Sequence, residues 1–327
     1  MADFEKGLPK GFVLAKPIAQ ENYDESVIYQ MEREGRLVIT RKRDGWKLLA
    51  HFDATGKIRL YTDGINEIDS RLDHIKEELS ELGLSPNTLV VGEAIVDEGD
   101  NDDLTKVISV FQSNLDKAQV LQKQHGRIRF MVFAGIDLLN SDNSSGSLSH
   151  SCFHRIYQLK GRYIFRVPIL LTAFDQAKKI VVEKGWEGLV LYEESYVLTY
   201  RADGKNPKRP QGCYKWKPIM EDDFIVREFV PRPDSTVKEL VLVQIDPATG
   251  EEFYCGKLGS FSDNLRRELA GMRYPIVVQA RFDTRYPKTG KIRNARFMRV
   301  RDDKKTSACV APRHYSSEPK EQGGENG

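Results

Sequence analysis

The sequence predicts an α+β protein of two domains, a larger one that mixes helices and strands and a smaller one built mainly from strands. Between residues 36 and 216, short segments rich in branched and aromatic residues alternate with segments of helical periodicity. After residues 217–222 the pattern changes, and five strand-like segments follow with a single helical one. A chain of 327 residues, 40% of them hydrophobic, can bury the cores that such a fold needs.

The larger domain opens with three antiparallel strands. Residues 36–42, 46–52 and 57–61 are rich in branched and aromatic residues and are separated by Asp-Gly and Thr-Gly turn signals. Helices are predicted at residues 70–82, 104–124 and 174–185, and further strands at residues 88–96, 127–139 and 187–193. Residues 140–150 and 201–212 are polar loops within this domain.

The smaller domain is predicted to be a five-stranded barrel of the OB type. Its strands are expected at residues 222–230, 239–246, 251–258, 275–283 and 295–301. A helix at residues 262–272, between the third and fourth strands, suits such a barrel. The predicted domains are therefore residues 1–218 and 219–304. The polar residues 305–327 are expected to form a disordered tail.

Charge and cysteine content narrow the class of protein. The 50 basic and 48 acidic residues give a net charge of +2, so any surface that binds a polyanion must be local. The four cysteines include no CxxC pair, which argues against a zinc ribbon and against a disulfide framework. Neither an apolar signal segment nor a run of about 18 apolar residues occurs. We therefore expect a soluble, cytoplasmic protein with no membrane partner.

Lys42 opens the string KRDGWK at the end of an apolar strand, where an Asp-Gly turn presents its side chain. Such a string is common in solvated turns, and alone it is a weak signal. Glu93 interrupts the apolar strand at residues 88–96, and Glu187 opens another apolar strand. A carboxylate in such a place must be paired or must bind a ligand or a metal, because burying it alone is costly.

Lys215 and Lys217 complete this group of charged residues. Alternate side chains of a strand share a face, so both lysines point to one side and Trp216 points to the other. Two cations on one face beside two carboxylates indicate a site for phosphate and metal.

The order of these features resembles that of the covalent nucleotidyltransferase superfamily, which contains DNA ligases, RNA ligases and mRNA capping enzymes. The resemblance runs from about residue 36 to residue 304. It comprises the KxDG of Lys42, the strand of Glu93, the strand that ends at Asp137, the Glu187-Gly188 strand, the KxK strand and the barrel. The chain looks most like a minimal ATP-dependent DNA ligase of phage or bacterial type. The implied fold is a nucleotidyltransferase domain with ATP-grasp-like antiparallel sheets and helices, followed by an OB-fold barrel.

The resemblance implies that Lys42 is the catalytic residue, which attacks the α-phosphate of ATP and carries AMP. AMP then passes to the 5′-phosphate at a nick, and the 3′-hydroxyl displaces it. A lysine with a pKa of about 10.4 is almost always charged at pH 7. Lys215 and Lys217 would disfavour that charge and hold the α-phosphate. Glu93, which also belongs to the nucleotide-binding set, and Glu187 would bind Mg²⁺ or Mn²⁺.

Around the nucleoside, the resemblance places Thr40 at the adenine and adds Arg41 and Lys47 as further contacts. Lys47 stands where the family usually has an arginine, so the charge is kept but the bidentate fork is lost. Phe133 or Ile136 would cover the face of the adenine.

The last predicted strand ends in a cluster of cations. Arg296, Arg299, Arg301 and Lys304 resemble the family's terminal element, which closes over ATP in the first step. The cluster also offers positive charge for a duplex backbone. The alternative is a basic edge strand that discourages pairing between sheets. The expected partner is nicked duplex DNA, bound by a monomer.

Two other classes of function are compatible with these motifs. An mRNA-capping guanylyltransferase or an RNA ligase would use the same lysyl-nucleotide chemistry, and an inactive nucleic-acid-binding module would keep the same fold. Glu187-Gly188 favours ligases over capping enzymes, and the terminal barrel favours DNA ligases over many RNA ligases.

Overall fold

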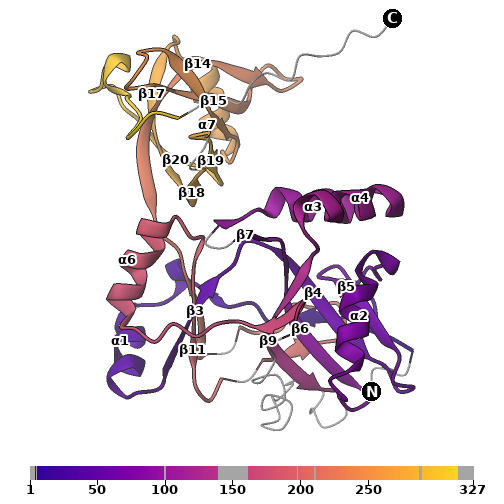
Figure 1. Cartoon of the computed structure of the whole chain (residues 1–327). Helices are drawn as coiled ribbons and strands as arrows, with labels where there is room; N and C mark the ends of the chain where they lie inside the picture. Colours follow the sequence, from indigo (N-terminus) through magenta and orange to yellow (C-terminus); the bar gives the residue numbers. More distant parts are fainter. Residues whose placement is uncertain are drawn as a thin grey trace, which may run out of the picture. The chain divides into compact units, whose positions relative to one another are not determined.

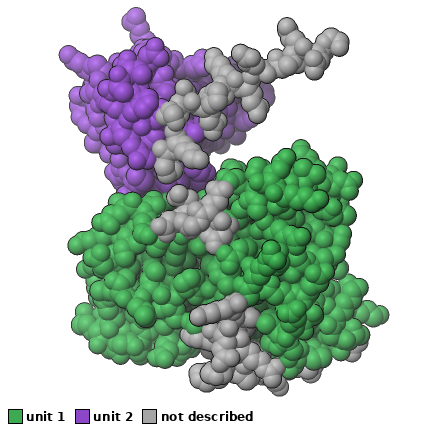
Figure 2. Space-filling model, in the orientation of Figure 1, with its two compact units in different colours: residues 1–217 green, residues 218–327 purple. Residues whose placement is uncertain are grey.

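The computed structural model describes residue 4 and residues 6–98, 101–138, 161–196, 198–209, 211–286 and 289–315. The chain divides into two compact units, residues 1–217 and 218–327 (Figure 2). The predicted boundary lies one residue further along, after residue 218. The loop expected at residues 140–150 falls outside the described residues.

The larger sheet of the first unit carries Glu93 and is antiparallel except at one edge. Across the sheet the strands are β10 (Ile164–Arg166), β9 (Arg129–Asp137), β6 (Thr88–Ile95), β4 (Trp46–Phe52) and β5 (Ile58–Thr62), with β10 parallel to β9. The helices packed on one face are α2 (Asp73–Ser80), α3 (Leu104–Gln112) and α4 (Leu115–His125) (Figure 1). Leu48, Val90 and Phe130 of the sheet join Ile75 and Val107 of the helices in a core whose side chains are almost fully buried.

The predicted helix at residues 104–124 is in fact two helices. α3 ends at Gln112, and Asn114 caps α4 by accepting a hydrogen bond from the backbone N–H of Lys117. Asparagine is favoured there because its side chain satisfies a backbone donor that the first turn leaves unpaired. The apolar spacing continues across the break, which explains why the sequence reads as one helix.

The smaller sheet of the first unit carries Lys42. Its strand order is β2 (Ile18–Ala19), β13 (Cys213–Trp216), β11 (Gly188–Glu193) and β3 (Leu37–Lys42). One face packs on α1 (Ser26–Arg33) and α6 (Phe174–Lys184). The core on that face includes Ile39, Leu189, Leu191, Tyr214 and Trp216. Alternate residues of the same strands therefore point to the opposite face.

Short elements complete the first unit. Near the start of the chain, β1 (Val13–Leu14) pairs with β12 (Tyr200–Arg201), and η1 (Gln20–Asn22) follows β2. After β6, the hairpin of β7 (Asp97–Glu98) and β8 (Asn101–Asp102) leads into α3. No helix among the described residues is long and apolar enough to span a membrane.

The second unit is built around one antiparallel five-stranded sheet. Its strand order is β16 (Glu252–Leu258), β15 (Val237–Ile245), β14 (Met220–Pro231), β17 (Ile276–Phe282) and β20 (Arg296–Val300). As predicted, a helix, α7 (Asp263–Ala270), lies between the third and fourth of these strands in the sequence. The sheet surrounds a core that includes Phe224, Leu242 and Val278.

The closed barrel predicted for this unit is not found. Among the described residues, the edge strands β16 and β20 do not pair with each other, and the sheet is open. The hairpin of β18 (Thr284–Arg285) and β19 (Ile292–Arg293) comes before β20, and the backbone of Ile292 lies beside Gly256 of β16. This hairpin therefore stands beside the edge strand with which β20 would have to pair.

The prediction of a disordered tail from residue 305 is wrong for residues 305–315. Thr306–Ala308 form a turn of 3₁₀ helix, and Val310 forms a parallel bridge with Ile245. Cys309, Ala311 and Tyr315 are buried. These few apolar side chains hold the segment on β15 and are hard to notice among polar neighbours in the sequence.

Candidate active site

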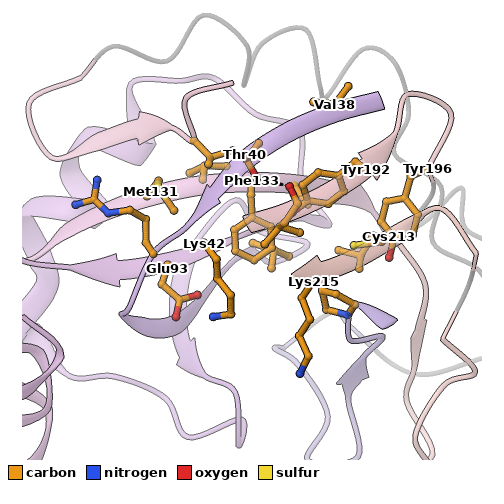
Figure 3. Close-up of a pocket in the computed structure, with 18 of the residues that line it drawn as sticks. Val38, Thr40, Lys42, Glu93, Met131, Phe133, Tyr192, Tyr196, Cys213 and Lys215 are labelled. Atoms are coloured by element: carbon orange, nitrogen blue, oxygen red, sulfur yellow. Dashed lines mark hydrogen bonds between the residues drawn. The ribbon is translucent and has the colours of Figure 1, made fainter. Parts of the chain in front are cut away.

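A cavity of about 900 Å³ in the first unit is lined by residues of both sheets (Figure 3). This volume lies within the usual range of small-molecule sites. The charged lining residues include Lys16, Lys42, Lys47, Asp63, Glu93 and Lys215. The apolar and aromatic lining residues include Val38, Phe133, Tyr192, Tyr196, Leu198 and Cys213.

Strand register places these two groups of residues. On the smaller sheet, Thr40 pairs with Val190, which pairs with Lys215, and all three line the cavity. The next row toward the aromatic side contains Val38, Tyr192 and Cys213. On the larger sheet, one row contains Lys47, Glu93 and Met131. The cavity is thus polar near the end of β3 and apolar further back along it.

Glu187 lies between two of the predicted lysines. Its Oε2 is 2.6 Å from Nζ of Lys42, and its Oε1 is 3.0 Å from Nζ of Lys217. Burial alone would raise the pKa of Glu187, but Lys42 and Lys217 outweigh it and hold the pKa below its ordinary value. Gly188 permits this convergence, because a Cβ there would lie 2.2 Å from the carbonyl oxygen of Trp216.

Glu93 has the most strongly shifted carboxylate of the site. Burial raises its pKa to about 7, with Glu187 and Asp44 acting in the same direction and Lys42 and Lys47 opposing them. Gly45 lets the turn after Lys42 lie directly on β6, since a Cβ there would lie 2.5 Å from the carbonyl oxygen of Ala94. Figure 3 shows the side chains of Lys42 and Glu93 next to each other.

The remaining predicted lysines also reach the cavity or its edge. Burial lowers the pKa of Lys215, and the positive charges of Lys217 and Lys42 lower it further. Nζ of Lys47 lies 3.0 Å from Oδ1 of Asp63, a carboxylate that the sequence analysis did not assign to the site.

Of the two residues predicted as alternatives to cover the adenine, Phe133 lines the cavity, whereas Ile136 is fully buried in the core behind it, with Leu89. The structure therefore favours Phe133, and its contact with adenine stays a prediction. On β9, Ile136 pairs with Leu89 and Met131 pairs with Glu93. A bulge in β9 near Phe133 lies between these two pairs. Tyr192 and Tyr196 were missed, although alternation from Val190 along β11 places Tyr192 on the cavity face.

Thr40 and Arg41 differ in what their side chains contact. Thr40 lines the cavity and donates a hydrogen bond to the carbonyl of Val190. Arg41 lies at the cavity edge, but its guanidinium contacts Asp102 at 3.1 Å and stacks over Trp186 at 4.4 Å. A contact between Arg41 and a nucleotide therefore stays a prediction.

The predicted cations of the last strand all belong to the second unit. Arg301 and Lys304 pair with Asp223 at 3.0 and 2.7 Å, and Arg299 donates to the side chain of Gln279. Arg296 stands opposite Arg281 on β17. Their contact with nucleotide or DNA stays a prediction.

A metal would depend on few protein ligands here. Within the described ranges, no group of three or more Asp, Glu, His or Cys side chains is placed to bind one ion. Mg²⁺ commonly takes one or two carboxylates and completes its shell with water and phosphate oxygens. Glu93 and Glu187 could supply these one or two carboxylates.

Comparisons with protein families and with curated proteins find no match. One solved structure, from a study of Lig E DNA ligases that bind DNA with a minimal scaffold, has a TM-score of 0.56 and 20% identity over 81% of this chain and 93% of that chain. Structures named Pmar-Lig_PreS3 and Pmar-Lig_Pre have TM-scores of 0.57 and 0.58, with 17% and 16% identity. Each covers 88% of this chain and 67% of its own. At such identities the likeness establishes the fold, and this chain has the fold of the minimal DNA ligases that the order of its motifs predicts.

Proposed function

We propose that this protein is an ATP-dependent DNA ligase that seals nicks between 5′-phosphate and 3′-hydroxyl ends through AMP carried on Lys42. The observation that carries the proposal is the 2.6 Å pairing of Lys42 with Glu187 beside a cavity of about 900 Å³. A second carboxylate, Glu93, and a further lysine, Lys215, line the same cavity. The likeness in fold to a Lig E DNA ligase supports DNA as the substrate.

In the proposed reaction, Lys42 is the nucleophile of the first step. Its ammonium leaves Glu187 and gives up a proton, and the neutral nitrogen attacks the α-phosphorus of ATP. The new N–P bond replaces the bond to pyrophosphate, which departs. An oxygen of the 5′-phosphate at the nick then attacks the same phosphorus and breaks the N–P bond. Finally the 3′-hydroxyl attacks the 5′-phosphate, loses its proton and displaces AMP.

We assign the parts of the nucleotide to the two sides of the cavity. The aromatic side, with Phe133 and Tyr192, would take adenine, and Thr40 lies between it and the charged side. Lys215 and Lys217 would hold the α-phosphate, and Lys47 would contact the ribose. This orientation puts the α-phosphate at the end of β3, within reach of Lys42.

Glu93 and Glu187 would hold a divalent metal, Mg²⁺ or Mn²⁺, together with phosphate oxygens and waters. The bound ion would neutralise negative charge on the reacting phosphates. The raised pKa of Glu93, about 7, supports this assignment, because a cation would stabilise a carboxylate that burial disfavours.

For the second unit we propose an OB-type role in binding nicked duplex DNA. The open five-stranded sheet with a helix after its third strand supports this assignment. Arg296 and Arg299 on β20 would supply charge for the backbone, and Arg301 and Lys304 would act on ATP in the first step. The active form would be a monomer.

The proposal is tested by offering the protein labelled ATP, GTP or NAD in separate reactions with Mg²⁺. A labelled protein adduct is expected with ATP alone, and nicked duplex DNA should then be sealed. An adduct with GTP but not ATP would favour a capping enzyme. Joining of single-stranded RNA without nicked DNA would favour an RNA ligase. The absence of an adduct with every nucleotide would refute lysyl-nucleotide chemistry.

A further inference from the structure

Asp102, at the end of β8, holds the turn that follows Lys42. Its Oδ1 accepts a hydrogen bond of 2.5 Å from Nε of Arg43, and its Oδ2 accepts one of 2.9 Å from the backbone N–H of Asp44. Oδ2 is also 3.1 Å from Nη2 of Arg41. The carboxylate therefore contacts residues on both sides of Lys42.

These contacts lie in a nearly dry environment. The side chains of Arg41, Asp102 and Arg43 are 9%, 5% and 8% exposed. Charged hydrogen bonds weaken little in such surroundings, because solvent does not screen them. The turn is thus held by strong, directional contacts.

The same network reaches the segments that carry the two carboxylates. Arg41 stacks over Trp186, the residue directly before Glu187. The β7–β8 hairpin that carries Asp102 follows β6, the strand of Glu93. Asp102 therefore connects the segments of Lys42, Glu93 and Glu187. It is not among the described residues that line the cavity.

We propose that Asp102 is a positioning residue, which fixes the direction in which β3 presents Lys42. This inference rests on the proposed role of Lys42 in forming lysyl-AMP. A misplacement of about 1 Å in a reacting group can cost on the order of 100-fold in rate. Since Lys42 is the nucleophile only in the first step, the loss should be confined to that step.

The main test compares Asp102→Asn with Asp103→Asn. Asp103 is the adjacent carboxylate, and its side chain caps α3 by accepting from the backbone N–H groups of Thr105 and Lys106, which an asparagine can also do. Asp102→Asn should slow lysyl-AMP formation at saturating ATP by roughly 30- to 100-fold. The KM for ATP should change little, and a nick with a pre-adenylated 5′ end should be sealed at the wild-type rate. Asp103→Asn should match the wild type throughout.

A second measurement is independent of activity. Hydrogen exchange at the amide of Asp44 should be faster in Asp102→Asn than in the wild type, because this amide donates to the lost carboxylate. If Asp102→Asn does not fold, Arg43→Gln removes the group that donates to Oδ1 of Asp102. This variant should show the same loss, confined to lysyl-AMP formation.

The outcomes separate this inference from the proposed function. A wild-type protein that forms no adduct refutes the function of Lys42, while exchange at Asp44 still decides whether Asp102 holds the turn. Equal rates of lysyl-AMP formation in the wild type and Asp102→Asn would overturn the positioning role. So would an equal loss in the first step and in the sealing of pre-adenylated nicks.

Discussion

Each unit of the molecule contains a nearly buried carboxylate between two cations. In the first unit Glu187 pairs with Lys42 and Lys217, and in the second unit Asp223 pairs with Arg301 and Lys304. The side chain of Glu187 is 11% exposed and that of Asp223 is 10% exposed. Burial and local pairing therefore do not distinguish a candidate active site from an ion cluster.

The surroundings of the two carboxylates do differ. Near Glu187, burial raises the pKa of Glu93 to about 7 against the opposing charges of Lys42 and Lys47, and burial with the charge of Lys217 lowers the pKa of Lys215, so both groups are pushed toward their neutral forms. Near Asp223, a hydrogen bond to Asp303 raises the pKa of Arg301, which keeps its charge. Titratable groups that are pushed away from their ordinary charge states are typical of functional sites, and of these two clusters the one around Glu187 contains such groups.

The largest expected difference between the clusters is chemical. Lys42→Ala should abolish the labelled adduct, a loss of at least about 10⁴-fold, because no other group forms the N–P bond. Lys304→Ala removes a comparable cation from Asp223 and should still form the adduct, at a rate reduced by roughly 10- to 100-fold. Adduct formation is measured with labelled ATP on a denaturing gel.

Sealing of a pre-adenylated nick provides the control for Lys42→Ala. The variant should retain this activity, which shows that the fold is intact. Persistence of the adduct in Lys42→Ala would remove the chemical basis of the comparison.

Glu93→Gln is expected to be less active than the wild type and, at pH 8, more stable. In the folded protein the pKa of Glu93 is about 7, against an ordinary value of 4.5. The folded state therefore binds the proton more tightly than the unfolded state does. This contribution to stability is complete below pH 4.5 and is lost as the pH rises to 7. At pH 8 the ionised carboxylate costs up to about 3 kcal/mol, which glutamine avoids.

Two measurements on Glu93→Gln test the direction of this pKa shift. Urea unfolding should show a variant more stable than the wild type at pH 8 and equally stable at pH 4.5. Adduct formation should fall by about 100-fold and should lose the increase between pH 6 and pH 8 that ionisation of Glu93 gives the wild type. A variant that is less stable at pH 8 would contradict the burial argument for Glu93.

Much of the first unit's site could be predicted from local patterns. Alternation in the KxK strand puts Trp216 in the core and Lys215 at the cavity, and an apolar strand end presents Lys42. Strand and helix positions follow from the same periodicities. These features depend on neighbours in the sequence, which is why the sequence alone reveals them.

The errors and omissions depend on contacts between distant residues. The bulge in β9 separates Phe133 from the row of Ile136. Gly92, opposite the bulge, is the one sequence signal, and a glycine inside a strand does not tell which strand bulges. Asp102 lies in an acidic string before a helix, where it resembles an ordinary cap. Its contacts with Arg43 and Asp44 span 59 and 58 residues of sequence. Only the folded chain shows that this carboxylate contacts the turn after Lys42.

The smallest expected effects on stability come from neutralising the two central carboxylates themselves. Asp223→Asn leaves Arg301 and Lys304 facing a neutral group, and since both are partly exposed it should cost about 2 kcal/mol, less than a fully buried pair. Glu187→Gln leaves Lys42 in the wall of the cavity and Lys217 partly exposed, so water can solvate both and the cost at pH 7 should be about 1 kcal/mol. That cost should shrink in acid, because the pKa of Glu187 is lowered in the folded state and its contribution is lost as the pH falls.

Activity should rank these two variants in the opposite order. Glu187→Gln should reduce adduct formation by about 100-fold, because it removes a metal ligand and the partner that places Lys42. Asp223→Asn should reduce it by less than about tenfold. Urea unfolding and adduct formation are measured on both variants. We expect Glu187→Gln to be the more stable of the two and also the less active. If Asp223→Asn were as inactive as Glu187→Gln, the pairing of Arg301 and Lys304 with Asp223 would matter to the first step as much as the pairing of Lys42 with Glu187, and charge perturbation would not be what separates the two clusters.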